Sequence, residues 1–408
     1  MSVGTRVFIV ERGPMAVWID RCLRAQGAET VVAFTEDEEP SPRLDEATYA
    51  AFVPDEPTMD QLIGAANDAG CDAIHPGLGR LAEDAAFAQE VAAANLLMIG
   101  PPYDRVGNAG DRHRAREVSR RAKVMPVPGT GLLRRGDAAP IDEVVKHLGL
   151  PLWIKDNRGR LAQRAETAEQ ADALARARLD AGEAIWFEAH VRQARHLVVA
   201  VAADAKGAVV ALGVRERSLR KNGMLTVDQL PASISAPLAA ALEDAAVAVA
   251  KGVGLQGLGA VGFLTDPSGA AWCLGMRPRL DLGMLLNDHV FGLRSPELQL
   301  RIARGEPLGF KRSDLSADGV ALGFRIRALA PGEIETWEPP ADALVFGDFA
   351  PTQRVVGLLA VLVVRAPTRQ ACIVKAQRLL KGFVVTGVET NIPAHLEALG
   401  DPGFWSAQ

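Results

Sequence analysis

The sequence predicts an α/β fold that becomes richer in antiparallel strands toward the C-terminus (α+β), and three observations support this. Short apolar segments alternate with helical segments in the first part of the chain, as in an open parallel sheet. Residues 259–276 read as two strands joined by a turn at 266–269, which predicts a β-hairpin. The chain has 408 residues, of which 48% are hydrophobic, so it can form two or three domains with proper cores.

In the first part of the chain, each apolar strand leads into a helix or a glycine turn. The strand at 6–10, for example, is followed by a helical segment that ends at Gly27. Connections of this kind place successive strands in parallel. We expect strands at 6–10, 29–34, 71–77 and 96–100, helices at 12–27, 58–69 and 81–95, and an end to this unit near residue 112.

After a hinge rich in proline and glycine at 124–131, strands follow one another with few helices between them. The segment 358–366 is the most apolar of the later strands. The sequence has no internal repeat and no low-complexity tract. We expect strands at 151–156, 185–191, 196–204, 208–217 and 358–366, helices at 168–182, 237–254 and 296–307, and a closing helix at 368–382.

The composition excludes several classes of function. The formal net charge of −5 argues against a general nucleic-acid or anionic-membrane binder. The four cysteines form no CxxC pair, which predicts free thiols in a reducing cytoplasm. No apolar run approaches the roughly 20 residues of a membrane span. We therefore expect a cytoplasmic protein with neither nucleic-acid nor membrane partners.

Several segments resemble, in the same order, the biotin carboxylase family, whose catalytic core is an ATP-grasp fold. ERGPMA is similar to that family's NRGEIA, AIHPGLGRLAED to HPGYGFLSEN, and GDR to GDK. ARHLVVAV is similar to PRHVEIQV, ELQLRIARGEPL is nearly the family text, and TGVETNIPAH resembles DGIKTN. The match extends over essentially the whole chain, and motifs of this length are far more specific than a single glycine motif.

The resemblance implies an architecture, a reaction and partners. The expected parts are an N-terminal α/β domain at 1–112, an ATP-grasp domain at 113–306 with a mobile lid at about 126–184, and a C-terminal β-rich region at 307–408. The family converts ATP and bicarbonate to carboxyphosphate and then transfers the carboxyl group to biotin. Its members commonly form homodimers or join carboxyltransferase and carrier subunits.

The positions that match the family's catalytic carboxylates hold glycine here. Gly262 and Gly275 match the two metal-binding glutamates, and Gly283 matches the glutamate that deprotonates bicarbonate. Arg277 matches an asparagine near the metal, and Leu225 matches a lysine that binds bicarbonate. Glycine can neither bind Mg²⁺, which takes oxygen ligands, nor accept a proton. We therefore expect no Mg²⁺ and no metal site.

Two further parts of the family machinery are reduced. The glycine run of the lid, whose N–H groups cradle phosphates in the family, is represented by Gly159 between Arg158 and Arg160. We favour a plain solvated turn there, with a basic anion contact as the alternative. The segment 342–348 lacks the arginine expected near biotin, and no AMKM-like turn occurs, so no covalent biotin is expected.

Other positions keep the residue types that the resemblance assigns to ligand binding. Each also has a structural alternative: the lysine as half of an ion pair at a strand end, the histidine as a core residue, and Arg279 as an interdomain salt bridge. The retained set comprises Arg112 and Lys155 for phosphate, Glu188 near adenine, His196 near ribose, Leu264 under the base, and Arg279 for an anion as the one catalytic remnant.

Asp281 is the acid best placed in the sequence to replace a missing glutamate, with Asp266 and Asp288 also nearby. It either points into the site or pairs with Arg279 or Arg277. A single carboxylate would not rebuild a clamp for two metal ions.

Three hypotheses follow. The favoured one is a catalytically degenerate biotin-carboxylase-like protein, a structural or regulatory subunit beside an active acyl-CoA carboxylase subunit. The second is an active ligase with rearranged metal ligands. The third, compatible with the first, is a sensor that binds a phosphorylated ligand without metal through Arg112, Lys155, Arg277 and Arg279. Binding of ATP is left open, and a homodimer or a carboxylase complex is expected.

Overall fold

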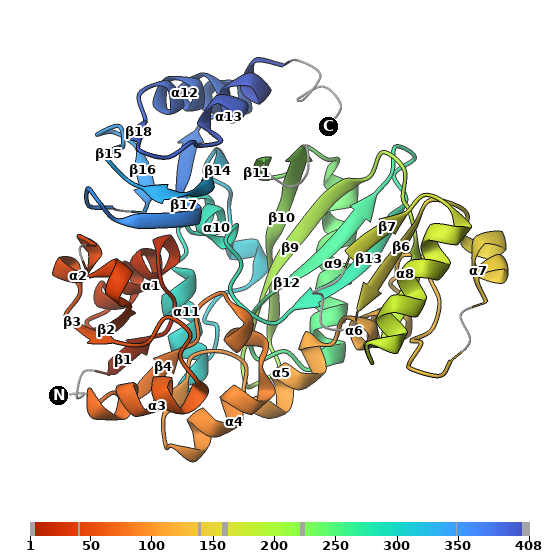
Figure 1. Cartoon of the computed structure of the whole chain (residues 1–408), viewed down its shortest axis with the longest axis horizontal. Helices are drawn as coiled ribbons and strands as arrows, with labels where there is room; N and C mark the ends of the chain where they lie inside the picture. Colours follow the sequence, from red (N-terminus) through yellow and green to blue (C-terminus); the bar gives the residue numbers. More distant parts are fainter. Residues whose placement is uncertain are drawn as a thin grey trace.

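The N-terminal part of the chain forms a five-stranded parallel sheet in the order β3-β2-β1-β4-β5 (Figure 1). The computed structural model describes residues 5–39, 41–137, 140–156, 162–220, 225–347 and 349–401. The predicted parallel sheet is confirmed, although the sequence did not indicate β3, whose side chains are mostly exposed. The strands are β1 (Arg6–Ile9), β2 (Glu29–Phe34), β3 (Tyr49–Phe52), β4 (Ala73–His75) and β5 (Leu97–Met98).

Helices cover this sheet, and their ends follow local sequence signals. Thr58 and Asp84 cap α3 and α4 by accepting hydrogen bonds from backbone N–H groups of the first turn. Phe8, Ile74 and Phe87 lie in the core between strands and helices. The elements are α1 (Pro14–Arg24), η1 (Glu36–Glu38), α2 (Arg43–Glu46), α3 (Met59–Asp68), η2 (Arg80–Glu83) and α4 (Ala85–Ala93).

Two helices that the sequence did not predict, α5 (Tyr103–Gly110) and α6 (Arg112–Arg121), connect this domain to the rest of the protein. The side chain of Asp111 caps α6 by accepting a 2.9 Å hydrogen bond from the backbone N–H of Arg114. Because α6 is rich in arginine, it lacks the apolar stripe by which helices are recognised in sequences. It nevertheless packs against β13 (Ala271–Arg277).

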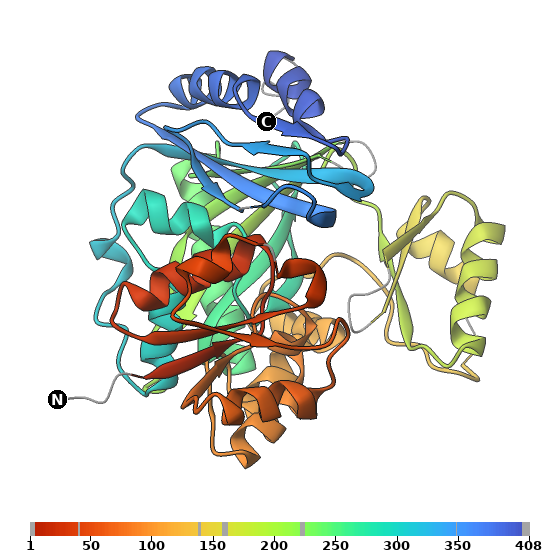
Figure 2. The same cartoon turned by 60° about the vertical axis from the view of Figure 1, so that its left-hand side comes forward.

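The lid region stands away from the body of the molecule (Figure 2). Its three antiparallel strands lie in the order β7-β6-β8, and two helices pack on them around a small core of their own. The hinge 124–131 meets the last lid strand through a bridge between Gly129 and Glu188. The elements are α7 (Ile141–Leu148), β6 (Leu152–Asp156), β7 (Ala162–Ala165), α8 (Ala168–Asp180) and β8 (Ile185–Ala189).

An eight-stranded antiparallel sheet forms the centre of the molecule, in the order β13-β12-β9-β10-β11-β14-β17-β16. The predicted hairpin is confirmed, since the N–H of Gly269 donates a 3.0 Å hydrogen bond to the carbonyl of Asp266 at the turn. Helix α9 (Ala236–Val253) packs on this sheet. The strands besides β13 are β9 (Arg195–Ala203), β10 (Val209–Arg220), β11 (Leu225–Leu230), β12 (Gly257–Thr265), β14 (Val320–Glu333), β16 (Leu344–Phe346) and β17 (Arg354–Ala366).

The C-terminal part completes the sheet and covers it. Helix α12 (Arg369–Lys381) agrees with the helix expected at 368–382, but it does not close the chain, because α13 (Ile392–Gly400) follows. The short α13 is stabilised by tertiary contacts, because Ile392 and Leu399 pack in the same hydrophobic core as α12. The remaining elements are α10 (Met284–Phe291), α11 (Ser295–Ala303), η3 (Arg312–Asp314), β15 (Thr336–Glu338) and β18 (Val384–Thr386).

Among the described residues, none of the helices combines the length and the hydropathy that crossing a bilayer requires.

Candidate functional site

The two glycines at the expected metal-ligand positions lie directly opposite each other. Gly262 on β12 is the cross-strand partner of Gly275 on β13, and Ala260 pairs with Arg277 two residues further along. The hairpin therefore brings together the two positions that match the family's metal-binding glutamates, but neither position carries a carboxylate. Within the described part of the chain, no group of three or more His, Cys, Asp or Glu side chains is arranged to hold a metal ion.

The two glycines differ in whether a residue with a side chain could replace them. Gly275 has a φ of +121°, a backbone conformation that residues with side chains rarely adopt, and the strand register shifts beside it, between Gly262 and Phe263. A Cβ added at Gly262 would lie 3.5 Å from Nε2 of His196, which is an ordinary contact. A side chain can therefore be accommodated at position 262, whereas at position 275 it would strain the backbone.

The position that matches the family's base is closed by an arginine. Gly283, just before α10, has a φ of −73°, which any residue adopts. A Cβ built on it, however, would lie 2.0 Å from Cζ of Arg215 on β10. The guanidinium group of Arg215 thus fills the space into which a side chain at position 283 would extend.

Arg215 belongs to a buried network of three arginines and two aspartates that the sequence analysis missed. Arg215 donates to Asp281 at 2.5 Å and lies 3.1 Å from Asp228. Arg217 contacts both aspartates at 3.2 Å, and Arg325 on β14 contacts Asp228 at 3.0 Å. Asp281 therefore pairs with Arg215 and Arg217. Of the two alternatives for this residue, pairing with Arg279 or Arg277 is wrong, whereas its position beside the expected site is confirmed.

The arginines keep both aspartates ionised. Burial raises the pKa of Asp228, but Arg217, Arg325 and Arg215 outweigh this and lower it to about 2. The same balance, with Arg215 as the largest favourable partner, holds the pKa of Asp281 well below its usual range. Neither carboxylate can therefore accept a proton near neutral pH.

One sequence signal pointed to this network. Arg215 and Arg217 are two residues apart on β10 and so face the same side of the sheet, and Arg217 is the cross-strand partner of Asp228. The spacing identifies the shared face, but only the folded loop shows that Asp281 reaches it.

Glu188, expected near adenine, is the centre of a second buried cluster. It accepts hydrogen bonds from Nζ of Lys155 and from Nη1 of Arg116, and a 3.0 Å bond from Nε1 of Trp186. Lys155, expected at phosphate, is thus an ion-paired lysine at the end of β6, which was the structural alternative for this residue. Arg116, on α6, was not predicted to take part.

His196 and Leu264 are cross-strand partners on β9 and β12, so the two residues expected near the nucleoside are neighbours. Burial, with a smaller contribution from Arg217, lowers the pKa of His196 to about 3. The imidazole is therefore neutral at physiological pH and is not an anion ligand by charge.

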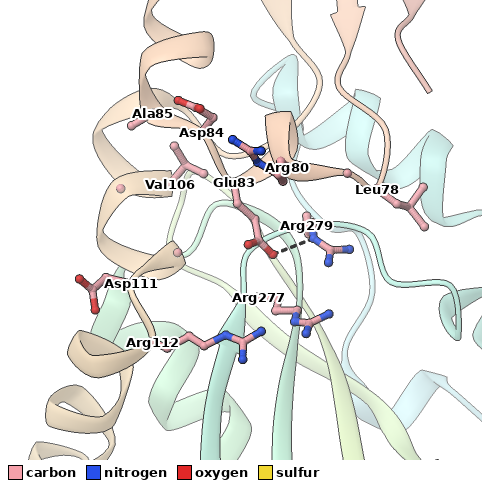
Figure 3. Close-up of a pocket in the computed structure, with 13 residues that line it drawn as sticks. Leu78, Arg80, Glu83, Asp84, Ala85, Val106, Asp111, Arg112, Arg277 and Arg279 are labelled. Atoms are coloured by element: carbon pink, nitrogen blue, oxygen red, sulfur yellow. Dashed lines mark hydrogen bonds and ion pairs between the residues drawn. The ribbon is translucent and has the colours of Figure 1, made fainter. Parts of the chain in front are cut away.

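Two adjoining pockets contain most of the predicted site residues. The larger, which we call the junction pocket, has a volume of about 690 Å³ and lies between the N-terminal domain and the end of β13 (Figure 3). The smaller, the inner pocket, has a volume of about 180 Å³ and is lined by Lys155, His196, Arg217, Gly262, Gly275 and Asp281. Arg112 and Arg277 line both pockets. Charged side chains of the junction pocket are Arg80, Glu83, Asp84, Asp111, Arg112, Arg277 and Arg279.

Arg277 and Arg279 differ in their partners. Nε of Arg279 donates a 2.7 Å hydrogen bond to Glu83 of η2, so this residue forms the interdomain ion pair that was its structural alternative while also lining the pocket. The side chain of Arg277 has no hydrogen-bond or ion-pair partner among the described residues. Burial, followed by repulsion from Arg112 and Arg279, lowers the pKa of Arg277 to about 10.

The carboxylates that line the two pockets do not suit Mg²⁺. Asp281 and Glu83 are held by arginines, while Asp84 and Asp111 cap helices. Mg²⁺ takes oxygen ligands and needs at least one or two such groups free.

Some expected site residues cannot be placed. Arg158, Gly159 and Arg160 lie outside the described residues, and of Leu225 only its backbone position at the start of β11 is described.

Comparisons with known proteins agree with this architecture. Residues 3–106 match the family model "Biotin carboxylase, N-terminal domain", and residues 111–311 match "Carbamoyl-phosphate synthase L chain, ATP binding domain". The biotin carboxylase domain of Hydrogenobacter thermophilus 2-oxoglutarate carboxylase superposes with a TM-score of 0.93 at 24% identity, covering 100% of this chain and 96% of that one. Campylobacter jejuni biotin carboxylase gives a TM-score of 0.91 at 23% identity, with coverage of 98% and 96%. The fold is therefore of the ATP-grasp class.

Sequence relatives define the family. The chloroplastic biotin carboxylase of Arabidopsis thaliana is 30% identical, with coverage of 97% of this chain and 79% of the relative. Biotin carboxylase 1 of Bacillus subtilis is 28% identical, with coverage of 99% and 96%. The chain belongs to the biotin carboxylase family.

Proposed function

We propose that this protein is a catalytically silent member of the biotin carboxylase family that acts as a structural or regulatory subunit beside an active acyl-CoA carboxylase subunit. The observation that carries the proposal is the position of Arg215. Its guanidinium occupies the space beside Gly283 where the resemblance expects a base, and Asp228 and Asp281 hold it there.

The chemistry of the family reaction supports this. Phosphoryl transfer relies on metal ions and cations that neutralise the developing charge, and deprotonation of bicarbonate needs a group that can accept a proton. Asp281 is the carboxylate of the inner pocket, and its arginine partners hold its pKa well below the usual range after outweighing the effect of burial. Arginine itself is always protonated at physiological pH and cannot serve as the base.

An active ligase with rearranged metal ligands is the alternative. It is favoured by the relatives, which are named as biotin carboxylases. It would require Glu83, the acid that lies in the junction pocket beside Arg279, to leave its 2.7 Å ion pair and take over metal binding or proton transfer. We favour the silent protein because this pair and the Asp281 network would both have to be broken.

The proposal includes an assembly and a location. A homodimer or a carboxylase complex is supported by the relatives, among them the biotin carboxylase domain dimer of 2-oxoglutarate carboxylase and the propionyl-CoA carboxylase alpha chain of Ruegeria pomeroyi, which is 27% identical. A cytoplasmic location is consistent with four free cysteines.

The proposal also includes binding of ATP or another phosphorylated ligand without Mg²⁺ and without covalent biotin. Arg112, which matches a phosphate-binding lysine of the family, and Arg277, which matches an asparagine near the metal, supply the cations for this binding. Calorimetry of ATP binding to the purified chain, with and without Mg²⁺, tests this. Binding that requires Mg²⁺ would revive the alternative, whereas binding of equal strength in both conditions is the expected result.

Turnover is measured in parallel as bicarbonate-dependent release of ADP in the presence of Mg²⁺ and free biotin, with Bacillus subtilis biotin carboxylase 1 as the positive control. We expect no release above background. Bicarbonate-dependent turnover by this chain would overturn the proposed function.

A further inference from the structure

Strand β3 is an unprotected edge of the N-terminal parallel sheet. It pairs with β2 and lies at one end of the order β3-β2-β1-β4-β5 (Figure 1). Native edge strands are commonly protected by charged residues, proline or a bulge, because their free N–H and C=O groups can pair with another chain. β3 consists of Tyr49, two alanines and Phe52 in an unbroken register with β2, so it has none of these protections.

The hydrogen bonds to β2 show which backbone groups of β3 face the open side. The N–H of Val53, just after β3, donates a 2.8 Å hydrogen bond to the carbonyl of Phe34 on β2. Because the backbone groups of successive residues point to opposite sides of a strand, those of Ala50 and Phe52 point away from β2. Both residues are exposed, so each offers one donor and one acceptor to a further strand.

Two exposed aromatic rings lie along this edge, one on each face of the sheet. Tyr49 is 48% exposed and Phe52 is 62% exposed. The guanidinium of Arg6 lies 4.7 Å from the centroid of the Tyr49 ring, and the Phe52 ring packs edge-on against Phe34 with a centroid distance of 5.9 Å. These contacts hold the rings in place, and aromatic side chains of this kind carry much of the binding energy of protein interfaces.

A group of acids, which we call the acidic corner, adjoins the C-terminal end of β3. Acidic residues follow both β2 and β3, whose ends lie side by side because the two strands are parallel. Arg12 links the two segments: its guanidinium lies 4.0 Å from Glu38 and donates a 3.2 Å hydrogen bond to the carbonyl of Asp55. This arginine alone cannot balance the acids, so the corner favours a basic partner. The acidic corner comprises Glu36, Asp37, Glu38, Glu39, Asp55 and Glu56.

We propose that the open edge of β3 is a docking site for an extended, basic segment of a partner protein, which adds to the sheet as a further strand. Main-chain hydrogen bonds to Ala50 and Phe52 supply affinity, while apolar side chains beside the two rings and cations at the acidic corner supply specificity. Antiparallel pairing, the more stable arrangement, places the cations at the N-terminal end of the segment.

This docking site goes beyond the proposed function and does not depend on it. β2 and β1 separate β3 from β4, and the loop after β4 lines the junction pocket. A change at the edge of β3 therefore leaves the residues of the two pockets in place.

The test is the fluorescence anisotropy of a labelled peptide, three lysines followed by Val-Thr-Val-Thr-Val, titrated with the purified chain. We expect binding that weakens as the salt concentration rises, because the acidic corner is exposed. One control peptide has glutamates in place of the lysines. The other has N-methyl groups on its valines and threonines, so it keeps the charge and loses the backbone donors. Each control should bind roughly tenfold more weakly or worse.

Variants of the chain locate the site. Ala50→Pro removes an N–H that points to the open side, a position at which edge strands tolerate proline, and it should weaken binding roughly tenfold. Ala50→Val keeps the N–H and should bind like the wild type. Asp37→Lys with Glu56→Lys should also weaken binding roughly tenfold or more, whereas the matched pair Asp142→Lys with Glu143→Lys, in the exposed first turn of α7, should not. Circular dichroism and the melting temperature check that each variant is folded.

Several outcomes would overturn the inference. The lysine peptide might fail to bind the wild-type chain, either control peptide could bind equally well, or a folded Ala50→Pro variant could bind like the wild type. If Ala50→Pro does not fold, the two charge-reversed pairs decide, and equal binding by both contradicts a site at the acidic corner.

Sedimentation velocity of the chain alone tests the other occupant of the edge. A dimer that Ala50→Pro dissociates would mean that a second copy of the chain covers β3, and this too would overturn the inference. The turnover assay is independent of these results: bicarbonate-dependent turnover would contradict the proposed function and leave the docking site untouched.

Discussion

The guanidinium group of Arg215 packs against the backbone of Gly283, so closely that a Cβ added to the glycine would lie 2.0 Å from Cζ of the arginine. The absence of a side chain at position 283 is therefore what leaves room for the guanidinium group from β10. Asp228 and Asp281 fix the arginine from the other side. Adding a glutamate back at position 283 would not restore a base, because its space is already filled.

This relationship predicts different effects of two glycine substitutions on stability. Gly283→Ala should lower the free energy of unfolding by about 1–3 kcal/mol, the usual range for overpacking, because Arg215 is buried and held by two aspartates. Gly262→Ala, the matched control, meets only contacts of 3.5 Å or more and should be neutral or slightly stabilising in a strand. Urea unfolding measures both. Equal stabilities of the two variants would show that Arg215 moves aside without cost.

Asp281→Asn should be strongly destabilising. The change leaves Arg215, which is 1% exposed, with one fewer counter-charge, and breaking a buried ion pair costs about 3–5 kcal/mol. The control is Asp318→Asn, which removes an exposed partner of Arg365 and should cost less than about 1 kcal/mol. Chemical denaturation measures the free energy of unfolding of both variants. If Asp281→Asn lowers it no more than Asp318→Asn does, the buried network does not stabilise the fold as predicted.

Asp288 predicts how stability changes with pH. Burial raises its pKa to about 7, although hydrogen bonds from Ser295 and Trp18 oppose the shift. In the unfolded chain this carboxyl ionises with its ordinary pKa of 3.8, while in the folded protein it stays protonated up to about pH 7. The free energy of unfolding contributed by this group should therefore fall as the pH rises from about 4 to about 7 and then stay constant.

Urea titrations across this range, compared between the wild type and Asp288→Asn, isolate that contribution. The difference between the two profiles should slope between about pH 4 and 7 and flatten above it. A difference that is constant over the whole range would mean that Asp288 has the same pKa in the folded and the unfolded protein.

Glu188→Gln should destabilise the hinge between α6 and the lid. Arg116 is 1% exposed and would lose its charged partner, which costs about 3 kcal/mol or more, and Lys155 would also be released. Trp186 donates a hydrogen bond to Glu188, so its fluorescence should change; because it is one of six tryptophans, the same variant in a Trp186→Phe background identifies its contribution. Glu166→Gln is the control, since Glu166 is an exposed partner of Arg164 in the same region. Unchanged fluorescence and stability in Glu188→Gln would refute this role.

Much of the fold was predictable because its signals are local. The alternation of apolar strands with helices gave the parallel sheet, and the turn after Asp266 gave the hairpin that aligns Gly262 with Gly275. Helices α6 and α13 were missed, because the arginine-rich α6 lacks an apolar stripe and the short α13 is stabilised by tertiary contacts of Ile392 and Leu399.

The site was predictable only in part. The resemblance identified which groups are missing and placed Arg112, Arg277 and Arg279 in one region, where the junction pocket contains them. It could not assign partners, because an ion pair depends on which side chains meet across strands that are distant in the sequence. Lys155 therefore proved to be held by Glu188, and Asp281 by Arg215.

The sequence by itself determined the family, the parallel N-terminal sheet and the chemical fact that glycine stands at three positions where a carboxylate is expected. Only the tertiary structure showed the surroundings of those glycines: Gly283 accommodates the guanidinium of Arg215, Gly275 adopts a positive φ, and at Gly262 a Cβ would make ordinary van der Waals contacts. The physical reason is that a sequence specifies which groups are present, whereas occupancy of a space and pairing of a charge depend on close packing between distant segments.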